Sequence, residues 1–230
     1  MRYLTALSLA IALGAGSAPA LDRLNPRATS LNLLLRSDSE IAPGVLESVE
    51  KEVRTIFSGT ALELQFEEPN QPGGTYSWMA VLRFHGVCAA GPVHGTPATK
   101  ERPVRELGTT HIVEGAIIPF ADIECDAVRR TLGIAKSGTT ALDEPILGRA
   151  LGRVVAHELY HILLKDEHHG RGLAAAAFSR SDLVAAHRSF DAADLNRMAS
   201  SLLGETRAAE APRPRLPGAG NSAMSFLDLH

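Results

Sequence analysis

Residues 151–172, LGRVVAHELYHILLKDEHHGRG, contain the pattern HExxH at His157, Glu158 and His161. Successive residues of an α-helix turn by about 100°, so two histidines four residues apart lie on one helix face. Their imidazoles can then meet at a single metal ion, and neutral imidazole suits zinc. Glu158, one step round the helix, is placed to accept a proton from a water at that ion. The pattern predicts two zinc ligands, His157 and His161, and a general base, Glu158.

Apolar residues recur at helical spacing on both sides of the motif, which predicts that an amphipathic helix carries it. These residues are Ile146, Leu147, Ala150, Leu151, Val154, Val155, Leu159, Ile162 and Leu163. Asp143 and Pro145 are typical of the start of such a helix. The motif is therefore expected in the middle of a helix, where both histidines can share a face.

Zinc lowers the pKa of a bound water to about 7. A carboxylate beside it can take the proton as the water attacks a carbonyl carbon. The reaction class that follows is metal-assisted hydrolysis, most often of peptide bonds. The alternative is a chance pair of core or surface histidines, because a short motif carries a false-positive risk.

A catalytic zinc usually has three protein ligands and one open position. Glu167, His168 and His169 follow the motif directly, and Asp182 is a more distant carboxylate. In an unbroken helix His169 would lie about 12 Å further along the axis than the second motif histidine. The chain must therefore leave the helix before it can supply a third ligand from this group.

Residues 165–167, Lys-Asp-Glu, are the expected exit from the helix, and Gly170 and Gly172 give the chain freedom to return. Residues 156–172, AHELYHILLKDEHHGRG, resemble the zinc-binding helix and following loop of the metzincin class of zinc metallopeptidases. The class pattern is HExxHxxGxxH. Here Leu164 stands at the glycine position and Glu167 at the position of the third histidine.

A group of mostly bacterial, secreted, metzincin-like proteins is more similar still, because a histidine follows their second motif histidine by eight residues. That position is His169, and the resemblance extends loosely over residues 30–183. It implies a zinc metalloendopeptidase in which His157, His161 and His169 bind Zn²⁺ and Glu158 is catalytic. His168, Glu167 and Asp182 remain alternative third ligands.

Metzincins also carry a methionine turn beneath the zinc. The corresponding segment here, residues 173–178, reads LAAAAF and has Ala174 nearest to the methionine position. This difference motivates a second hypothesis, in which the chain is a secreted zinc-binding module without catalysis.

The remaining patterns predict an α+β fold, with a mixed twisted sheet of about five strands, two main helices and a C-terminal helix. The expected strands are 30–36, 61–66, 76–84, 109–113 and 116–123, and the expected helices are 45–57, 126–132, one from 143 onward and 179–203. The metzincin resemblance implies that the third and fifth strands lie side by side. Cys88 and Cys125 would then lie close together at the ends of these strands.

Residues 1–20 are expected to be a signal peptide, with Arg2, an apolar run and Ala18-Pro19-Ala20 before the cut. The signal peptide predicts a secreted or periplasmic protein. The metallopeptidase domain is expected over 21–204, followed by a disordered tail over 205–230. In an oxidising compartment the two cysteines can form a disulfide, and two separate buried thiols are the alternative.

The 230 residues, 45% hydrophobic with a net charge of −3, are enough for one core. No cluster of Lys and Arg with interleaved aromatics occurs, which argues against nucleic-acid binding. No apolar run reaches about 18 residues, which argues against a membrane anchor. The expected partner is a protein or peptide substrate, bound by a monomer.

Four further side chains are expected to have no catalytic role. Tyr160 is predicted to be a core residue, and Arg153 a solvated residue on the flank of the motif helix. His85 and His94, at the ends of a long Gly- and Pro-rich loop, are expected to be solvated.

Overall fold

A computed structural model describes residues 29–60, 62–67, 78–90, 106–134 and 143–210. The described chain forms a five-stranded mixed sheet in the order β2-β1-β3-β5-β4. Its strands are β1 (Thr29–Ser37), β2 (Leu62–Glu67), β3 (Trp78–His85), β4 (Gly108–Val113) and β5 (Ala116–Glu124). Only β4, at one edge, is antiparallel to its neighbour. The predicted α+β class and five-stranded mixed sheet are confirmed, and the third and fifth strands are neighbours.

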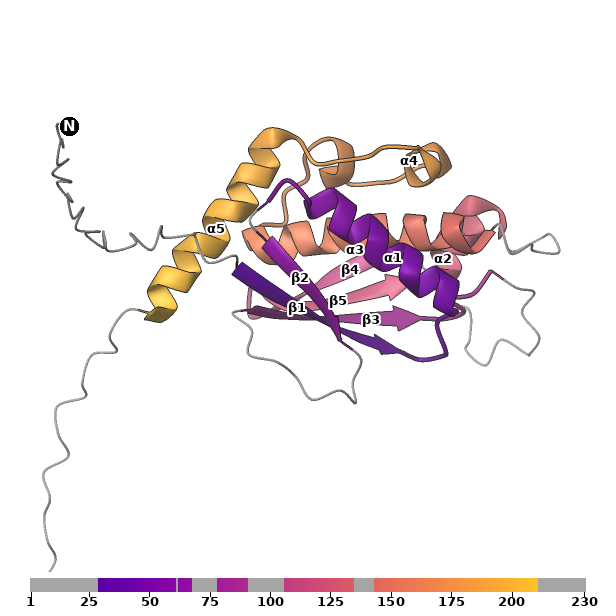
Figure 1. The fold of residues 1–230 in the computed structure, drawn as a ribbon, viewed down its shortest axis with the longest axis horizontal. Coiled ribbons are helices and arrows are strands. Elements are labelled where there is room, and N and C mark those ends of the chain that lie inside the picture. The colour runs from indigo at the N-terminus through magenta and orange to yellow at the C-terminus, as the bar shows by residue number, and fades with distance from the viewer. Residues whose placement is uncertain (1–28, 61, 68–77, 91–105, 135–142, 211–230) are drawn as a thin grey trace, which may run out of the picture.

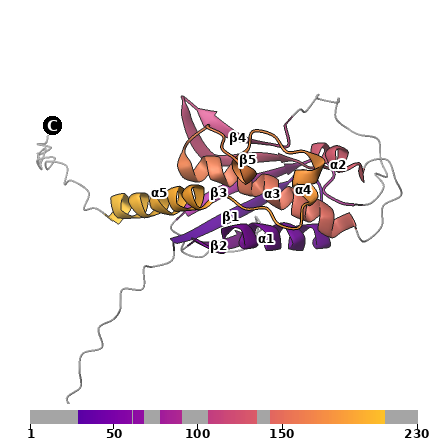
Figure 2. The same cartoon turned by 90° about the horizontal axis from the view of Figure 1, so that it is seen from above.

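Two long helices, α1 (Pro43–Phe57) and α3 (Asp143–Leu164), lie side by side over one face of the sheet (Figure 1). The shorter helices are α2 (Cys125–Leu132) and α4 (Arg180–Val184). The C-terminal helix α5 (Ala192–Glu210) contacts α3 and β1 at one end of the sheet (Figure 2). Apolar side chains from one face of each central strand meet the helices and form the core.

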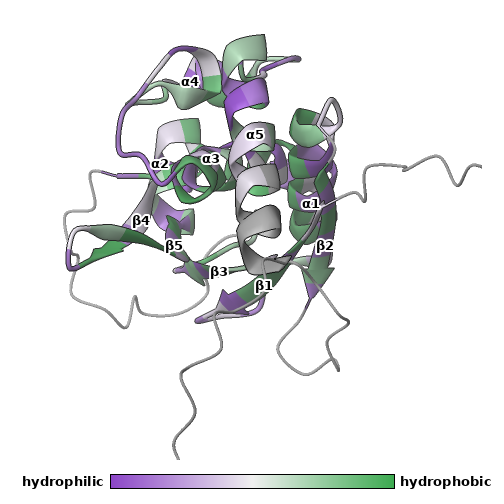
Figure 3. Cartoon of the chain, turned by 90° about the vertical axis from the view of Figure 1, so that its left-hand side faces the viewer, coloured by the Kyte–Doolittle hydropathy of each residue, from purple (hydrophilic) through white to green (hydrophobic). Residues whose placement is uncertain are grey.

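Helix α3 was expected to be amphipathic, but it is buried on all sides. Every residue from Leu147 to Leu163 except Arg149 is buried. In Figure 3 it is seen nearly end-on, largely hydrophobic and enclosed by the sheet and the other helices. Its contact with α1 is close. A Cβ on Gly148 would lie 2.5 Å from the carbonyl oxygen of Val45, so only glycine allows this approach.

The helical region expected over 179–203 is divided into α4 and α5. Ser179 caps α4 and forms a capping box with Asp182. Phe190 is buried between the two helices and stacks on Tyr160 at 5.4 Å. Asp191 then starts α5 by accepting a hydrogen bond from the Asp194 amide at 2.8 Å. Helix α4 thus ends at Val184, and α5 begins with the capping residue that follows the buried Phe190.

The helix α5 ends at Glu210, beyond the boundary of 204 that we expected for the domain. The proposed signal peptide and residues 211–230 of the proposed tail lie outside the described residues. None of the helices in the described part of the chain combines the length and apolar content needed to cross a bilayer.

The predicted disulfide between Cys88 and Cys125 is confirmed, with the two Cα atoms 5.2 Å apart. It joins the segment after β3 to the first residue of α2, and both cysteines are fully buried. Because β3 and β5 are parallel neighbours, their carboxyl ends lie at the same end of the sheet. The disulfide therefore covers the core at that end.

A polar network crosses the opposite face of the sheet and is centred on Asp122 of β5. Its carboxylate accepts hydrogen bonds from Arg83 at 2.8 and 3.2 Å, from His85 at 2.9 Å and from His111 of β4 at 2.8 Å. Burial alone would raise the pKa of the Asp122 carboxyl, but these three donors hold it far below its usual range.

His85 was expected to be solvated, and this is wrong, because it ends β3 with only a quarter of its side chain exposed. Burial lowers its pKa, but hydrogen bonds to Asp122 and to Asp38, at 2.5 Å, outweigh burial and raise the pKa above its ordinary value. Together these bonds of the Asp122 network tie the end of β1 to β3, β5 and β4. His94 lies outside the described residues.

Replacing both Cys88 and Cys125 with Ala should lower the free energy of unfolding by about 3–4 kcal/mol, since the bridge closes a loop that is otherwise free in the unfolded chain. The measurement is chemical denaturation of the purified protein under oxidising conditions. Reduction of the wild type should produce the same loss and should leave the double variant unchanged. An unfolding midpoint that does not respond to reductant would contradict the prediction.

Replacing His85 with Gln should remove a pH-dependent part of the stability. A folded-state pKa above the unfolded value of about 6.5 gives stability that is complete below this pH and is lost as pH rises through the folded pKa. Denaturation curves between about pH 5.5 and 8.5 should therefore show wild type and variant converging at high pH. The exposed His187→Gln variant is the control and should follow the wild type.

Candidate metal centre

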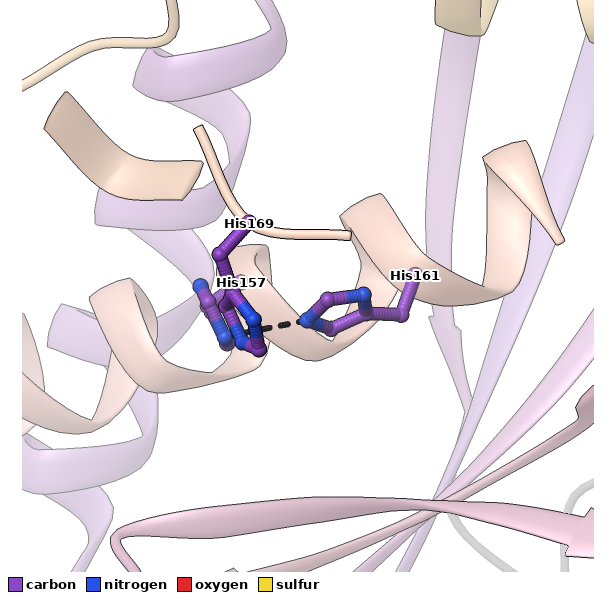
Figure 4. A group of neighbouring side chains, drawn as sticks. All are labelled: His157, His161 and His169. Atoms are coloured by element: carbon purple, nitrogen blue, oxygen red, sulfur yellow. Dashed lines mark hydrogen bonds between the residues drawn. The ribbon is translucent and has the colours of Figure 1, made fainter. Parts of the chain in front are cut away.

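Three imidazoles, those of His157, His161 and His169, come together at the C-terminal half of α3 (Figure 4). Their ligand nitrogens all lie within 4.8 Å of one another. The Nε2 atoms of His157 and His161 are 3.1 Å apart. Two nitrogens bound to one tetrahedral zinc at about 2.0–2.1 Å lie about 3.3–3.4 Å apart. The three histidines could hold a metal ion.

The other ring nitrogens of the helical histidines are already engaged. Nδ1 of His157 donates to the Leu173 carbonyl, and Nδ1 of His161 donates to the Asp166 carbonyl, both at 2.7 Å. These bonds fix the tautomers and direct both Nε2 atoms toward the shared centre. Burial lowers the pKa of His157 to about 4 and also lowers that of His161. Both rings are therefore neutral near pH 7, the state in which imidazole binds a metal.

The chain after α3 turns back sharply to supply His169. The helix ends at Leu164, and Lys165 takes a left-handed conformation with φ 52°, which is uncommon for a side chain other than glycine. Gly172, with φ 63°, makes the second turn. The amide of Gly170 donates to the Ala174 carbonyl at 2.7 Å and closes the loop. The exit near Lys165 and the use of Gly172 agree with the sequence-based expectation.

The three alternative ligands lie elsewhere. His168 points into solvent, with 92% of its side chain exposed, and bonds the Asp166 carboxylate at 2.6 Å. Glu167 is exposed at the rim of the cleft, and Asp182 is used in the capping box of α4. Of the candidates proposed from sequence, the structure brings only His169 to the two helical histidines.

Side chains of α5 support the loop of residues 165–174, the His169 loop, and sequence reasoning did not identify them. Arg197 donates to the Tyr160 hydroxyl and to the Asp194 carboxylate, both at 2.7 Å, and lies 3.9 Å from the Asp166 carboxylate. The carbonyl of Asp166 is the group that orients His161. Tyr160 is a core residue, as expected, and also anchors this support through its hydroxyl.

Glu158 lies beside the histidines and is 4% exposed. Its Oε2 accepts a hydrogen bond from the Thr110 hydroxyl of β4 at 2.7 Å. Burial raises the pKa of the Glu158 carboxyl to about 7, although the bonds from Thr110 act in the opposite direction. A carboxylate with a pKa near neutrality is suited to accept and return a proton at physiological pH.

A cleft of about 480 Å³ opens over the three histidines and Glu158, between β4 and residues 175–178, which follow the His169 loop. His157 packs edge-on against Phe178 at 5.4 Å, and Ala174 is fully buried. The remaining described lining residues are Glu106, Leu107, Gly108, Thr109, Thr110, Ile112, Ile117, Thr131, Val154, Glu167, Ala175, Ala176 and Ala177. The cleft is thus walled by a sheet edge on one side and by small apolar residues on the other.

Arg153 was predicted to be solvated, and this is wrong, because it is fully buried. Its guanidinium donates to the Glu52 carboxylate of α1 at 2.8 Å and to the carbonyls of Asp182 and Ala185 at 2.6 Å. All three of its nitrogen groups are engaged, which offsets the cost of burying the charge. The residue joins α1, α3 and the end of α4 behind the cleft.

Replacing His169 with Ala should weaken zinc binding by about 100-fold or more, since even an outer-shell partner is worth about 10–100-fold. The neighbouring His168→Ala is the matched control and should bind zinc as the wild type does. Metal affinity is measured by competition with a chromophoric chelator, and stoichiometry by elemental analysis. Equal affinities for the two variants would exclude His169 as a ligand.

No family model matches the chain, and no curated protein is significantly similar to it. The chemistry of this cleft must therefore be inferred from its own side chains. Those side chains form a three-imidazole donor set with an adjacent buried carboxylate.

Proposed function

We propose that the protein is an exported zinc-dependent metalloendopeptidase of the metzincin type. The observation that carries this proposal is the convergence of His157, His161 and His169 beside the buried carboxylate of Glu158 at the floor of a cleft. The order of the strands supports it, since the third and fifth strands are neighbours as the resemblance implies.

The donor set favours zinc over other abundant metals. Three imidazole nitrogens suit zinc, whereas calcium and magnesium prefer oxygen ligands. The fixed tautomers of His157 and His161 leave Nε2 free on each ring. Three protein ligands leave one position open, as in catalytic rather than structural zinc sites.

Bound zinc would supply the positive charge that makes a water acidic near neutral pH and that polarises a substrate carbonyl. Glu158 takes the proton from that water on its carboxylate and later donates it to the leaving amine nitrogen. Its burial keeps bulk water from competing for this proton. Both steps need only the one carboxylate, which is buried beside the three histidines.

An extended peptide is the substrate that fits the shape of this site. Strand β4 is at the sheet edge, and Gly108, Thr109, Thr110 and Ile112 of β4 line the cleft. A peptide that adds to this edge gains backbone hydrogen bonds independent of its sequence. Its side chains would then alternate between the cleft and solvent. This mode of binding favours a protein or peptide in an unfolded segment.

The second hypothesis, a zinc-binding module without catalysis, makes the same metal-binding prediction. It is favoured by the segment over 173–178, in which Ala174 stands where metzincins carry methionine. The two hypotheses differ only in hydrolysis. Zinc binding without cleavage of any peptide in a broad library supports the module.

Replacing Glu158 with Gln should abolish peptide hydrolysis and leave zinc binding unchanged, because glutamine keeps the size of the side chain but cannot accept the proton. The expected loss of kcat is about 10²–10⁴-fold, the usual contribution of a general base. The measurement is cleavage of a peptide library by the zinc-loaded protein, followed by mass spectrometry. An unchanged rate in the variant would rule out this mechanism.

A further inference from the structure

Strand β4, rather than α3, provides the side-chain hydrogen bond that Glu158 makes. The Thr110 hydroxyl lies 2.7 Å from Oε2 of Glu158 and 3.3 Å from the carbonyl oxygen of the same residue. The shorter contact is to the carboxylate, which is 4% exposed and has little access to water. A buried carboxylate that loses its donor must find another or move.

The neighbouring Gly108 provides the space that this carboxylate occupies. A Cβ at position 108 would lie 2.6 Å from Oε1 of Glu158 and 2.8 Å from Cγ1 of Val154. Gly108 is not among the described residues with positive φ, so space rather than backbone conformation requires a glycine there. Two residues of β4 thus contact the two oxygens of one carboxylate.

The position of β4 is itself fixed from the far face of the sheet. Successive residues of a strand point to opposite faces, so Thr110 faces α3 while His111 faces away. His111 bonds Asp122 at 2.8 Å and packs edge-on against Phe120 at 4.8 Å. The pairing of Thr110 with Ala121 lies directly beside this contact. The Asp122 network therefore holds the strand from which the Thr110 hydroxyl is presented.

We propose that Thr110 is the positioning residue for the general base: its hydroxyl holds Oε2 of Glu158, and Gly108 leaves room for Oε1, so that the carboxylate meets the cleft in one orientation. The effect that Thr110 should have on kcat rests on the proposed peptidase function, whereas its effect on the orientation of the Glu158 carboxylate does not. Rotation of the carboxylate requires the Thr110 bond to break.

The test compares Thr110→Val, which keeps the shape of the side chain but removes the hydroxyl, with Thr110→Ser, which keeps the hydroxyl. In the zinc-loaded full chain, Thr110→Val should lower kcat for a cleaved peptide by about 10–100-fold, the cost of a carboxylate displaced by about 1 Å. KM should change by less than about threefold, because the substrate contacts remain. Thr110→Ser should restore most of the lost kcat. Equal kcat in wild type and Thr110→Val would overturn the proposal.

A second readout does not depend on activity. Crystal structures of zinc-loaded wild type and Thr110→Val should show the same three histidine ligands, with the Glu158 carboxylate in a different orientation only in the variant. An unchanged orientation in Thr110→Val overturns the proposal even if the wild type cleaves no peptide. Absence of cleavage by the wild type would instead count against the proposed function alone. Zinc affinity, equal in all three proteins, shows that the variants are folded.

Gly108→Ala provides an independent check on the space around Oε1. The added methyl group should force the carboxylate away from β4 and reduce kcat at least as much as loss of the hydroxyl. Gly115→Ala is the matched control: Gly115 lies in the turn after β4, and a Cβ there would meet nothing within 4 Å. Its φ of 77° predicts some loss of stability but no change in the orientation of Glu158. Full activity of Gly108→Ala would contradict the close packing on which the proposal depends.

Discussion

Hydrogen bonds made by buried polar side chains of α3 determine the course of the chain that follows it. A buried donor or acceptor left without a partner costs about 1–3 kcal/mol, and α3 buries two imidazoles, a carboxylate and a guanidinium. The partners of both imidazoles are carbonyls beyond the helix, at Asp166 and Leu173. Satisfying them requires residues 165–174 to fold back over the helix. His169 is carried to the other two histidines by this requirement.

Local pattern was sufficient to predict most of the secondary structure and the centre of the site. The apolar spacing around His157 predicts the helix that the structure shows from Asp143 to Leu164. The alternation in residues 61–66 predicts β2, and the two cysteines predict the bridge. For the helix and the strand, the relevant signal lies in residues that are close together in the sequence. For the disulfide, each of the two cysteines has only one possible partner. His169 was preferred because of a resemblance, and the structure places it beside His157.

The residues that sequence reasoning missed have partners that are distant in the chain. Arg153 bonds Glu52, 101 positions away, and a charged residue on a helix is normally assigned to the surface. Thr110 is an ordinary strand residue until the fold brings it to Glu158, 48 positions away. His85 follows the same rule, because its partners are Asp38, just after β1, and Asp122 on β5. Local pattern contains no signal for these contacts, which exist only once the sheet and helices are packed.

The support of the His169 loop by Arg197 has a consequence for the order in which the site can form during synthesis. The ribosome releases the histidine pair of α3 well before the residue that steadies Tyr160 and Asp166. A growing polypeptide thus presents His157 and His161 early, and gains the support of Asp166, whose carbonyl orients His161, only after Arg197 has been translated. Such timing would delay the final orientation of His161 until α5 has begun to emerge from the ribosome.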